Sequence, residues 1–497
     1  MGIVFRQSVK TTIVIALGAV MGACINIAYT HMLVNRDFGF ITYILAVCAM
    51  LQMLVQFGTS TLLQTFIQKY NAADERRPVL FTFALCVPLI TVGLLCIPFF
   101  LFKTQIINYH NPADRGNLLT FYNLVPFTVL LWSYMTVFDL FFVSQSRPAL
   151  STFMREVVLR VCNITLMLLL FLKVITFTVF VTGLLLMYGI PVLVLFLITA
   201  QSEEKVISFN WRAFTKKEYG EMLHFSWYHL LLFASAYLIG SIDVLMLGAK
   251  DKIGMESLPV YKIALYIISL MLIPSTAMTA ATYPMLNKAY LNNAHDELQS
   301  LFKRSAINIL LVTLGVVTIL FCNLHNIDMF LGKGIRYEQL LKIFSILMIG
   351  RLIDVATGLN NDLISISRYY KFSFRISILL VGLVFVFDYL LIPRYSVYGA
   401  AWGTTLAFSI FNILKMVFLW KKLKIQPFTY HTLMLFAAIL PALIAGLYLP
   451  FVMNKYIDLM ARSLTIAFIY AGMLLWLKPS PDLTTYLASV KKDKRLF

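Results

Sequence analysis

The chain has 497 residues, of which 60% are hydrophobic and 13% are charged, and its mean hydropathy is +0.82. A soluble domain keeps about a quarter of its residues charged, so this composition excludes a soluble protein and is typical of a polytopic membrane protein. The net charge of +18 is spread over short segments between apolar runs, as in loops at a membrane surface. No nucleic-acid partner is needed to explain it.

Apolar runs long enough to cross a bilayer follow one another along the whole chain. A transmembrane helix needs about 20 largely apolar residues. The first run is not followed by a small-residue cleavage site, so we expect a retained span instead of a cleaved signal peptide. We predict an all-α membrane protein with about fourteen transmembrane helices, at 11–34, 39–66, 79–101, 118–144, 150–172, 174–198, 220–247, 258–285, 305–323, 338–364, 373–392, 396–420, 428–450 and 461–477.

The basic residues favour one orientation of these spans. Short cytoplasmic loops of membrane proteins carry an excess of lysine and arginine. If the amino terminus is inside, 25 of the 41 basic residues lie in inner segments, 12 in outer segments and 4 within spans. We therefore expect both termini in the cytoplasm, with the "KKDKRLF" tail on the anionic inner leaflet.

The connections between the spans are too short to fold as a catalytic domain. The sequence contains neither a GxxxxGK[ST] phosphate loop nor a DxD motif. The six cysteines lie in or at the ends of apolar runs without CxxC spacing, which indicates packing residues. We therefore expect a membrane transporter that is not an enzyme and that has no metal site and no cofactor. Coupling to Na⁺ or H⁺ stays open.

A weak internal repeat divides the chain. The stretches "DFGFITYILAV" at 37–47 and "SLPVYKIALYI" at 257–267 both open a span and are 220 residues apart. Transporters often consist of two related bundles with the substrate site between them. We predict an amino-terminal six-helix bundle, a cytoplasmic linker, a second six-helix bundle, transmembrane helices 13 and 14, and a basic cytoplasmic tail, at 1–200, 201–219, 220–424, 425–478 and 479–497.

Three stretches carry a resemblance to a known family. With the span count and the 6+6+2 division, "NRDFGFITYILAV", "LIDVATGLNNDLISISRYYKF" and "YSVYGAAWGTTLAF" resemble the oligosaccharide flippases of the multidrug/oligosaccharidyl-lipid/polysaccharide exporter superfamily. The resemblance covers essentially the whole chain and is closest to the polysaccharide biosynthesis branch. It rests on the order and spacing of the stretches.

The resemblance implies a function. Flippases of this kind move undecaprenyl-pyrophosphate-linked oligosaccharide, the repeat unit of O-antigen (lipopolysaccharide), capsule or exopolysaccharide, across the bacterial plasma (inner) membrane by alternating access. The implied partners are this lipid-linked glycan and membrane lipids, with glycosyltransferases or a polymerase of the same pathway as further candidates. A cation-coupled exporter of small amphiphiles and a membrane glycan polymerase stay open as alternatives.

A polar stripe is expected in the tenth span. Arg351, Asp354, Gly358 and Asn361 recur at helical spacing, which places them on one face. Because an ionised side chain at the bilayer centre costs about 2.5 to 3.5 kcal/mol, this face must meet a cavity or a partner helix. Arg351 is a candidate for binding a phosphate, with Asp354 holding the guanidinium in place. A purely structural ion pair stays open as the alternative.

The fifth span offers a counterpart in the first half of the chain. Glu156, Arg160 and Asn163 share one face, and a glutamate four residues before an arginine is the favoured order for a helical ion pair. Two arginines within the membrane, one in each half, suit an anionic head group. Asn26 in the first span is a further candidate for contact with the substrate. Structural salt bridges again stay open.

The sequence also departs from its relatives. The lipid II flippases of the superfamily carry several arginines in the first two spans, whereas here the polar residues within these spans are Asn26, Gln52, Gln56 and Gln64. Lipid II is therefore not the expected substrate.

Overall fold

The structure, a computed structural model, describes residues 2–70, 74–145, 148–201, 206–332, 334–451 and 454–483, and these form helices and connecting turns. The chain divides into two compact units, Met1–Leu258 and Pro259–Phe497, which are taken separately below. The predicted all-helical architecture is confirmed. The predicted division into bundles, linker and tail stays a prediction. Residues 202–205 of the linker and 484–497 of the tail lie outside the described residues.

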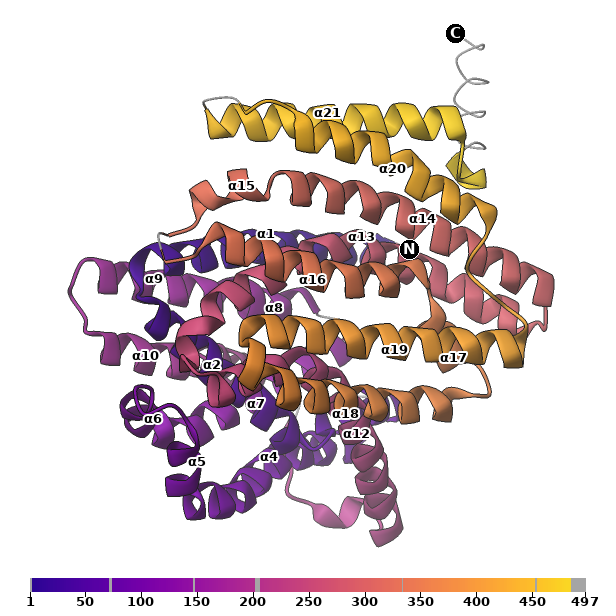
Figure 1. Ribbon diagram of the computed structural model, residues 1–497. Helices are drawn as coiled ribbons and strands as arrows, with labels where there is room; N and C mark the ends of the chain where they lie inside the picture. The colour runs from indigo at the N-terminus through magenta and orange to yellow at the C-terminus, as the bar shows by residue number, and fades with distance from the viewer. Residues whose placement is uncertain are drawn as a thin grey trace. The chain divides into compact units, whose positions relative to one another are not determined.

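Unit 1 contains twelve α-helices within its described residues (Figure 1). The longest, α12, begins at a capping box in which Thr215 and Glu218 exchange hydrogen bonds with the opposite backbone. The helices are α1 (Gly2–Met32), α2 (Asn35–Gln56), α3 (Thr59–Phe66), α4 (Arg76–Leu101), α5 (Lys103–Tyr109), α6 (Arg115–Phe121), α7 (Val125–Ser144), α8 (Pro148–Phe153), α9 (Leu159–Phe171), α10 (Phe177–Leu186), α11 (Gly189–Ala200) and α12 (Lys216–Lys250).

Unit 2 holds the remaining helices, beginning with α13, whose first residue closes unit 1. Figure 1 shows α20 and α21 lying beside each other and next to α14. The helices are α13 (Leu258–Leu291), α14 (His295–Cys322), α15 (Leu324–Ile327), α16 (Tyr337–Ala356), α17 (Asn360–Ile366), α18 (Tyr370–Tyr395), α19 (Val397–Leu423), α20 (Tyr430–Tyr448) and α21 (Lys455–Leu477).

Each of the fourteen predicted runs lies in helical structure, but not each is one unbroken span. Within the described ranges, ten helices are long and apolar enough to cross a membrane. The other four runs lie in α1, whose apolar part Leu17–Met32 is shorter, in α12, and in the interrupted runs 150–172 and 338–364. The chain is thus a multi-pass membrane protein, and the count of fourteen stays a prediction.

Several predicted runs are interrupted. In the run 39–66, Phe57 and Gly58 both have positive φ, and a side chain on Gly58 would lie 2.3 Å from the carbonyl of Ser226 on α12. In the run 150–172, a π-helical turn separates α8 from α9. In the run 338–364, α16 ends at Ala356 and α17 begins at Asn360. The runs 118–144 and 174–198 are likewise divided, between α6 and α7 and between α10 and α11. The assumption of continuous helices was wrong in these runs.

Aromatic packing holds the core of unit 1. The ring of Phe81 on α4 lies 4.1 Å from that of Phe141 and 5.7 Å from that of Phe138, both on α7. Buried leucines of α3 complete this cluster. Aromatic pairs add about 0.5 to 1.5 kcal/mol beyond the area they bury.

The core of unit 2 joins α14 to α20 and α21 through buried aliphatic side chains. Glycines then bring α18 and α19 together. A side chain on Gly399 would lie 2.4 Å from the carbonyl oxygen of Leu391, and one on Gly403 would lie 2.4 Å from Oδ1 of Asp388. Small residues at a helix interface allow this close approach of two helices.

A polar cluster at one end of unit 1 ties the start of α2 to two connecting segments. Asp114, which is 1% exposed, accepts a hydrogen bond from the backbone N–H of Met255 (3.1 Å) and pairs with Nε of Arg36 at 3.3 Å. Tyr43 on α2 bonds Nε2 of His110 at 2.6 Å. Gly254 has a φ of +65°, and a side chain there would meet the Asp114 carboxylate at 2.1 Å. The glycine is therefore required at this position.

We predict that Gly399→Ala destabilises the protein by about 1 to 3 kcal/mol, because the added methyl group must displace the backbone of α18. Chemical unfolding in detergent measures the effect. Gly382→Ala in α18 is the matched control, since its Cβ would have nothing within 4 Å. The control is expected to be neutral or stabilising by about 0.5 to 1 kcal/mol. Equal effects of the two changes would refute the close approach of α18 and α19.

We also predict that His110 makes the stability of the protein pH-dependent. Burial lowers the pKa of the His110 imidazole and Arg115 adds to this, while the Ile106 carbonyl and Asp114 oppose it. In the unfolded chain the imidazole has a pKa near 6.5, and in the folded chain its pKa is lower. The folded protein therefore binds the proton less readily than the unfolded chain. The stabilisation is complete above about pH 6.5 and is lost as the pH falls through the folded pKa.

The measurement is the melting temperature of wild type and His110→Gln between about pH 7.5 and about pH 5.5. The wild type should lose more stability on acidification than the variant. Parallel curves for the two proteins would show that His110 does not titrate with unfolding.

Candidate polar sites within the two units

The predicted pair in unit 1 is present and short. Nη1 of Arg160 on α9 donates to Oε2 of Glu156 at 2.6 Å and to the Glu156 backbone carbonyl at 2.5 Å. The Arg160 and Glu156 side chains are 27% and 19% exposed. A partly buried charge pair of this kind is held strongly, because each partner leaves the other uncompensated when it is removed.

A π-helical turn, Met154–Val158, carries Glu156. Single π-turns inside α-helices are rare and occur frequently at functional sites. No pattern in the sequence predicts this turn. Arg155, in the same turn, pairs with Asp139 on α7 and also with Oε1 of Glu156 at 3.2 Å. Two acids and two arginines thus form a chain with no net charge.

The two glycines of α1 make room for this cluster. A side chain on Gly18 would lie 2.9 Å from the Glu156 carbonyl, and one on Gly22 would lie 3.2 Å from Nε of Arg160. The groove that these small residues leave on α1 receives the Glu156–Arg160 ion pair. The sequence feature that could have predicted this contact is the presence of small residues on one helix and a charged pair on another.

The two predicted asparagines of unit 1 are engaged by neighbours. Asn163 Oδ1 accepts a hydrogen bond from the hydroxyl of Tyr29 on α1 at 2.7 Å. Asn26 donates to the Gly22 carbonyl one turn before it in α1, at 2.8 Å. Both side chains are half-buried. The structure therefore brings Glu156, Arg160 and Asn163 against α1, with Asn26 on the same helix.

The pair in unit 2 is looser. Nη1 of Arg351 lies 3.8 Å from Oδ2 of Asp354, beyond hydrogen-bond length, and the two side chains are 25% and 32% exposed. The guanidinium lies over the ring of Phe408 on α19, 4.1 Å from its centroid. Gly350 permits this approach, since its Cβ would be 3.0 Å from the backbone of Thr405. Asp354 therefore does not occupy the N–H donors of Arg351.

Asn361 does not continue the stripe of Arg351 and Asp354, and the prediction of one continuous helical face was wrong. Gly358 has a φ of +67° and separates α16 from α17. Asn361 instead accepts a hydrogen bond from Ser373 on α18, at 3.2 Å. At the break, the Thr357 hydroxyl donates to the backbone carbonyl of Asp354 at 2.8 Å. Asn360 in turn donates to the Thr357 hydroxyl at 2.9 Å and to Oδ1 of Asn412 on α19 at 3.3 Å.

Lys415 belongs to the same region and was missed by the sequence analysis. A lysine near the end of a transmembrane helix usually extends to the membrane surface. Instead Lys415 is 2% exposed, and its ammonium lies 3.8 Å from the ring centroid of Phe411. Its charge interacts with those of Asp354 and Asp362. Unit 2 therefore repeats the arrangement of unit 1, with two bases and two acids.

The described side chains offer ion pairs and amides to a ligand but no metal-binding group. No three His, Cys, Asp or Glu side chains gather within the described ranges. The structure thus defines a multi-pass helical membrane protein that holds a charge-balanced polar cluster inside each of its units.

Sequence comparison gives the family. The pattern of the family described as "Polysaccharide biosynthesis protein" matches residues 30–334, more than half of the chain, so the chain belongs to this family. The capsular polysaccharide biosynthesis protein CapF of Staphylococcus aureus is 24% identical over 180 residues, which are 36% of this chain and 44% of CapF. The match thus spans less than half of that relative's length.

Solved structures share the fold. The lipid II flippase MurJ, in an inward closed conformation, matches with a TM-score of 0.74 at 12% identity over 94% of this chain and 98% of MurJ. An inward-facing multidrug resistance transporter of the MATE family gives 0.66 at 14% identity, over 84% and 98% of the two chains. The chain therefore has the fold of the multidrug/oligosaccharidyl-lipid/polysaccharide exporter superfamily, and the predicted resemblance is confirmed.

We predict that Glu156 and Arg160 are energetically coupled. A double-mutant cycle of Glu156→Gln and Arg160→Gln, followed by unfolding in detergent, should give a coupling energy of about 0.5 to 3 kcal/mol. Each single change removes one charge and deprives the other of its shortest ion pair. Additive effects would mean that the two charges face water independently.

Proposed function

We propose that the protein is a flippase that translocates undecaprenyl-pyrophosphate-linked oligosaccharide across the bacterial plasma membrane by alternating access. Membership of the polysaccharide biosynthesis protein family supports this proposal most directly. The shared fold with a lipid II flippase and with multidrug transporters is consistent with transport without an enzymatic step. The orientation proposed from the loop charges places both termini in the cytoplasm.

Arg351 is the residue we propose for contact with the pyrophosphate. Its guanidinium is oriented by the Phe408 ring and by a loose ion pair, and it stays one-quarter exposed. A planar guanidinium can donate two parallel hydrogen bonds to a phosphate. Arg160 differs, because it already donates to both a carboxylate and a carbonyl of Glu156. We assign Arg160 and Glu156, with Asn163 and Asn26, to holding and shaping the polar surface of unit 1.

The polar groups of α17 complete the proposal in unit 2. Asn361 is exposed and is fixed by Ser373, so its amide nitrogen is oriented. Amides of this kind suit the hydroxyl groups of a sugar. We propose Asp354 as the counter-charge of Arg351 when no anion is bound.

The test is transport in liposomes that carry undecaprenyl-pyrophosphate-linked glycan on the inner leaflet, followed by exposure of the glycan to an external glycosidase. Wild-type protein should expose the glycan, and Arg351→Gln should lower the initial rate about tenfold or more, since a charge-assisted hydrogen bond is lost. Arg351→Lys should restore only part of the rate, because an ammonium cannot make the bidentate contact.

Arg394→Gln is the matched control, because Arg394 is an exposed arginine in the last turn of α18. Melting temperatures establish that all variants fold. A wild type that exposes no glycan would contradict the proposed function and favour an exporter of small amphiphiles. If Arg351→Gln exposes the glycan at the wild-type rate, the flippase function stands, and Arg351 has a structural role.

A further inference from the structure

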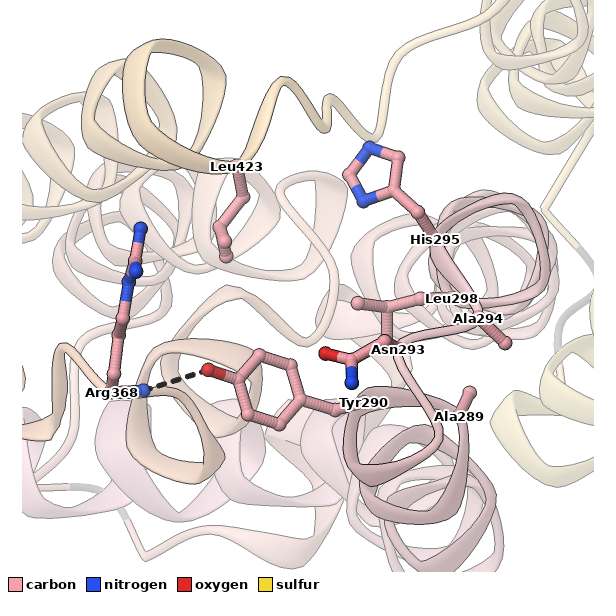
Figure 2. A pocket seen from close by; sticks show the side chains of 8 residues that line it. All are labelled: Ala289, Tyr290, Asn293, Ala294, His295, Leu298, Arg368 and Leu423. Carbon is pink, nitrogen blue, oxygen red and sulfur yellow. Dashed lines mark hydrogen bonds between the residues drawn. The ribbon is translucent and has the colours of Figure 1, made fainter.

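A cavity of about 450 Å³ lies within unit 2 and is separate from the cluster around Arg351. It is formed where α13 and α19 end and where α14 and α18 begin, so it lies at one end of these four helices. Figure 2 shows its lining side chains, which are Ala289, Tyr290, Asn293, Ala294, His295, Leu298, Arg368 and Leu423. The transport proposal gives this cavity no role.

The lining has a polar rim and an apolar floor. Ala289 and Leu298 are buried, whereas Asn293, His295 and Arg368 are exposed. In Figure 2, Arg368 lies on one side of the cavity, with His295 and Asn293 on the other. None of the eight lining residues is acidic. The rim therefore presents hydrogen-bond donors around a centre that carries no negative charge.

The donors of the rim are held in place. The hydroxyl of Tyr290 accepts a hydrogen bond from the backbone N–H of Arg368 at 2.9 Å, which leaves its own O–H to donate (Figure 2). Nη2 of Arg368 donates to the hydroxyl of Tyr369 at 2.8 Å, and the guanidinium lies over that ring. Asn293 has a φ of +54°, so the turn before α14 is tightly wound. An oriented arginine is well suited to a phosphate.

The flanking sequence is basic as well. Lys288 precedes the lining residue Ala289, and Lys421, Lys422 and Lys424 surround Leu423. Asp296 and Glu297 stand in the first turn of α14 but do not line the cavity. A volume of about 450 Å³ is much larger than a bare inorganic anion needs and lies within the range of sites for small organic molecules.

We propose that this cavity binds a phosphate ester, with the phosphate at Arg368 and Tyr290 and the carbon part on Leu298 and Ala289. The ester has two sources with the same chemistry, the head group of an anionic phospholipid and a soluble organic phosphate. The loop charges predict that this end of unit 2 faces the cytoplasm, where both are present. The site does not depend on the proposed transport of glycan.

The test measures binding to the purified full-length protein in nanodiscs. In one arm, native mass spectrometry counts phosphatidylglycerol retained against phosphatidylcholine. In the other, sn-glycerol 1-phosphate is added to protein in phosphatidylcholine nanodiscs and the shift in melting temperature is recorded. Binding in either arm should weaken about tenfold or more in Arg368→Gln, and also weaken in Tyr290→Phe, which keeps the ring.

Arg375→Gln is the matched control, because Arg375 is an exposed arginine of α18 that does not line the cavity. A response only in the first arm assigns the site to a lipid head group, and a response only in the second assigns it to a soluble phosphate. Equal binding by wild type and Arg368→Gln in both arms, or equal loss in Arg375→Gln, overturns the proposal. The melting temperature without ligand shows that each variant is folded.

Discussion

Charges within an apolar protein must be paired, and this constraint organises both units. In unit 1, Arg155 and Arg160 are neutralised by Asp139 and Glu156. In unit 2, Arg351 and Lys415 are accompanied by Asp354 and Asp362. The two clusters differ in tightness, because the Glu156 pair is hydrogen-bonded and the Asp354 pair is not. A basic side chain that binds an anionic substrate is better placed in the looser cluster, because its hydrogen-bond donors are not already occupied.

Irregular backbone accompanies both clusters. The π-turn Met154–Val158 carries Glu156, and the interruption after Ala356 follows Asp354 by a few residues. Backbone groups released inside an apolar environment need partners, and Thr357 donates to the Asp354 carbonyl in unit 2. Side-chain hydrogen bonds link Thr357 to Asn360 and Asn412. Thr357 therefore serves the backbone as well as the polar network. The interruption between α16 and α17 sets the positions of these polar residues.

Local patterns in the sequence predicted the helical runs and the contacts that depend on helical spacing. Glu156 and Arg160 are four residues apart, so their pairing follows from the geometry of one turn. The interruption at Gly358 was not predictable in the same way, because a glycine in an apolar run is compatible with a continuous helix. The residue that leaves no room for a side chain at this glycine, Ala306 of α14, is distant in sequence.

The burial of Lys415 was hidden for a similar reason. A lysine near a helix end usually extends to the surface. Here the ammonium is buried beside the Phe411 ring, and two carboxylates from elsewhere in the chain interact with its charge. Periodicity reports which face of a helix a residue occupies, and it does not report which partner lies opposite. The partners of Arg351 and Arg160 that are distant in sequence, namely Phe408 and α1, were not predicted for the same reason.

Gly358 also has a use in comparing sequences. Any other residue there would need a left-handed backbone, and its Cβ would lie 2.8 Å from that of Ala306. Both constraints arise from the fold, and neither depends on the transported substrate. In a comparison with distant relatives, a glycine between two apolar helices is therefore expected to mark the register of α16 and α17.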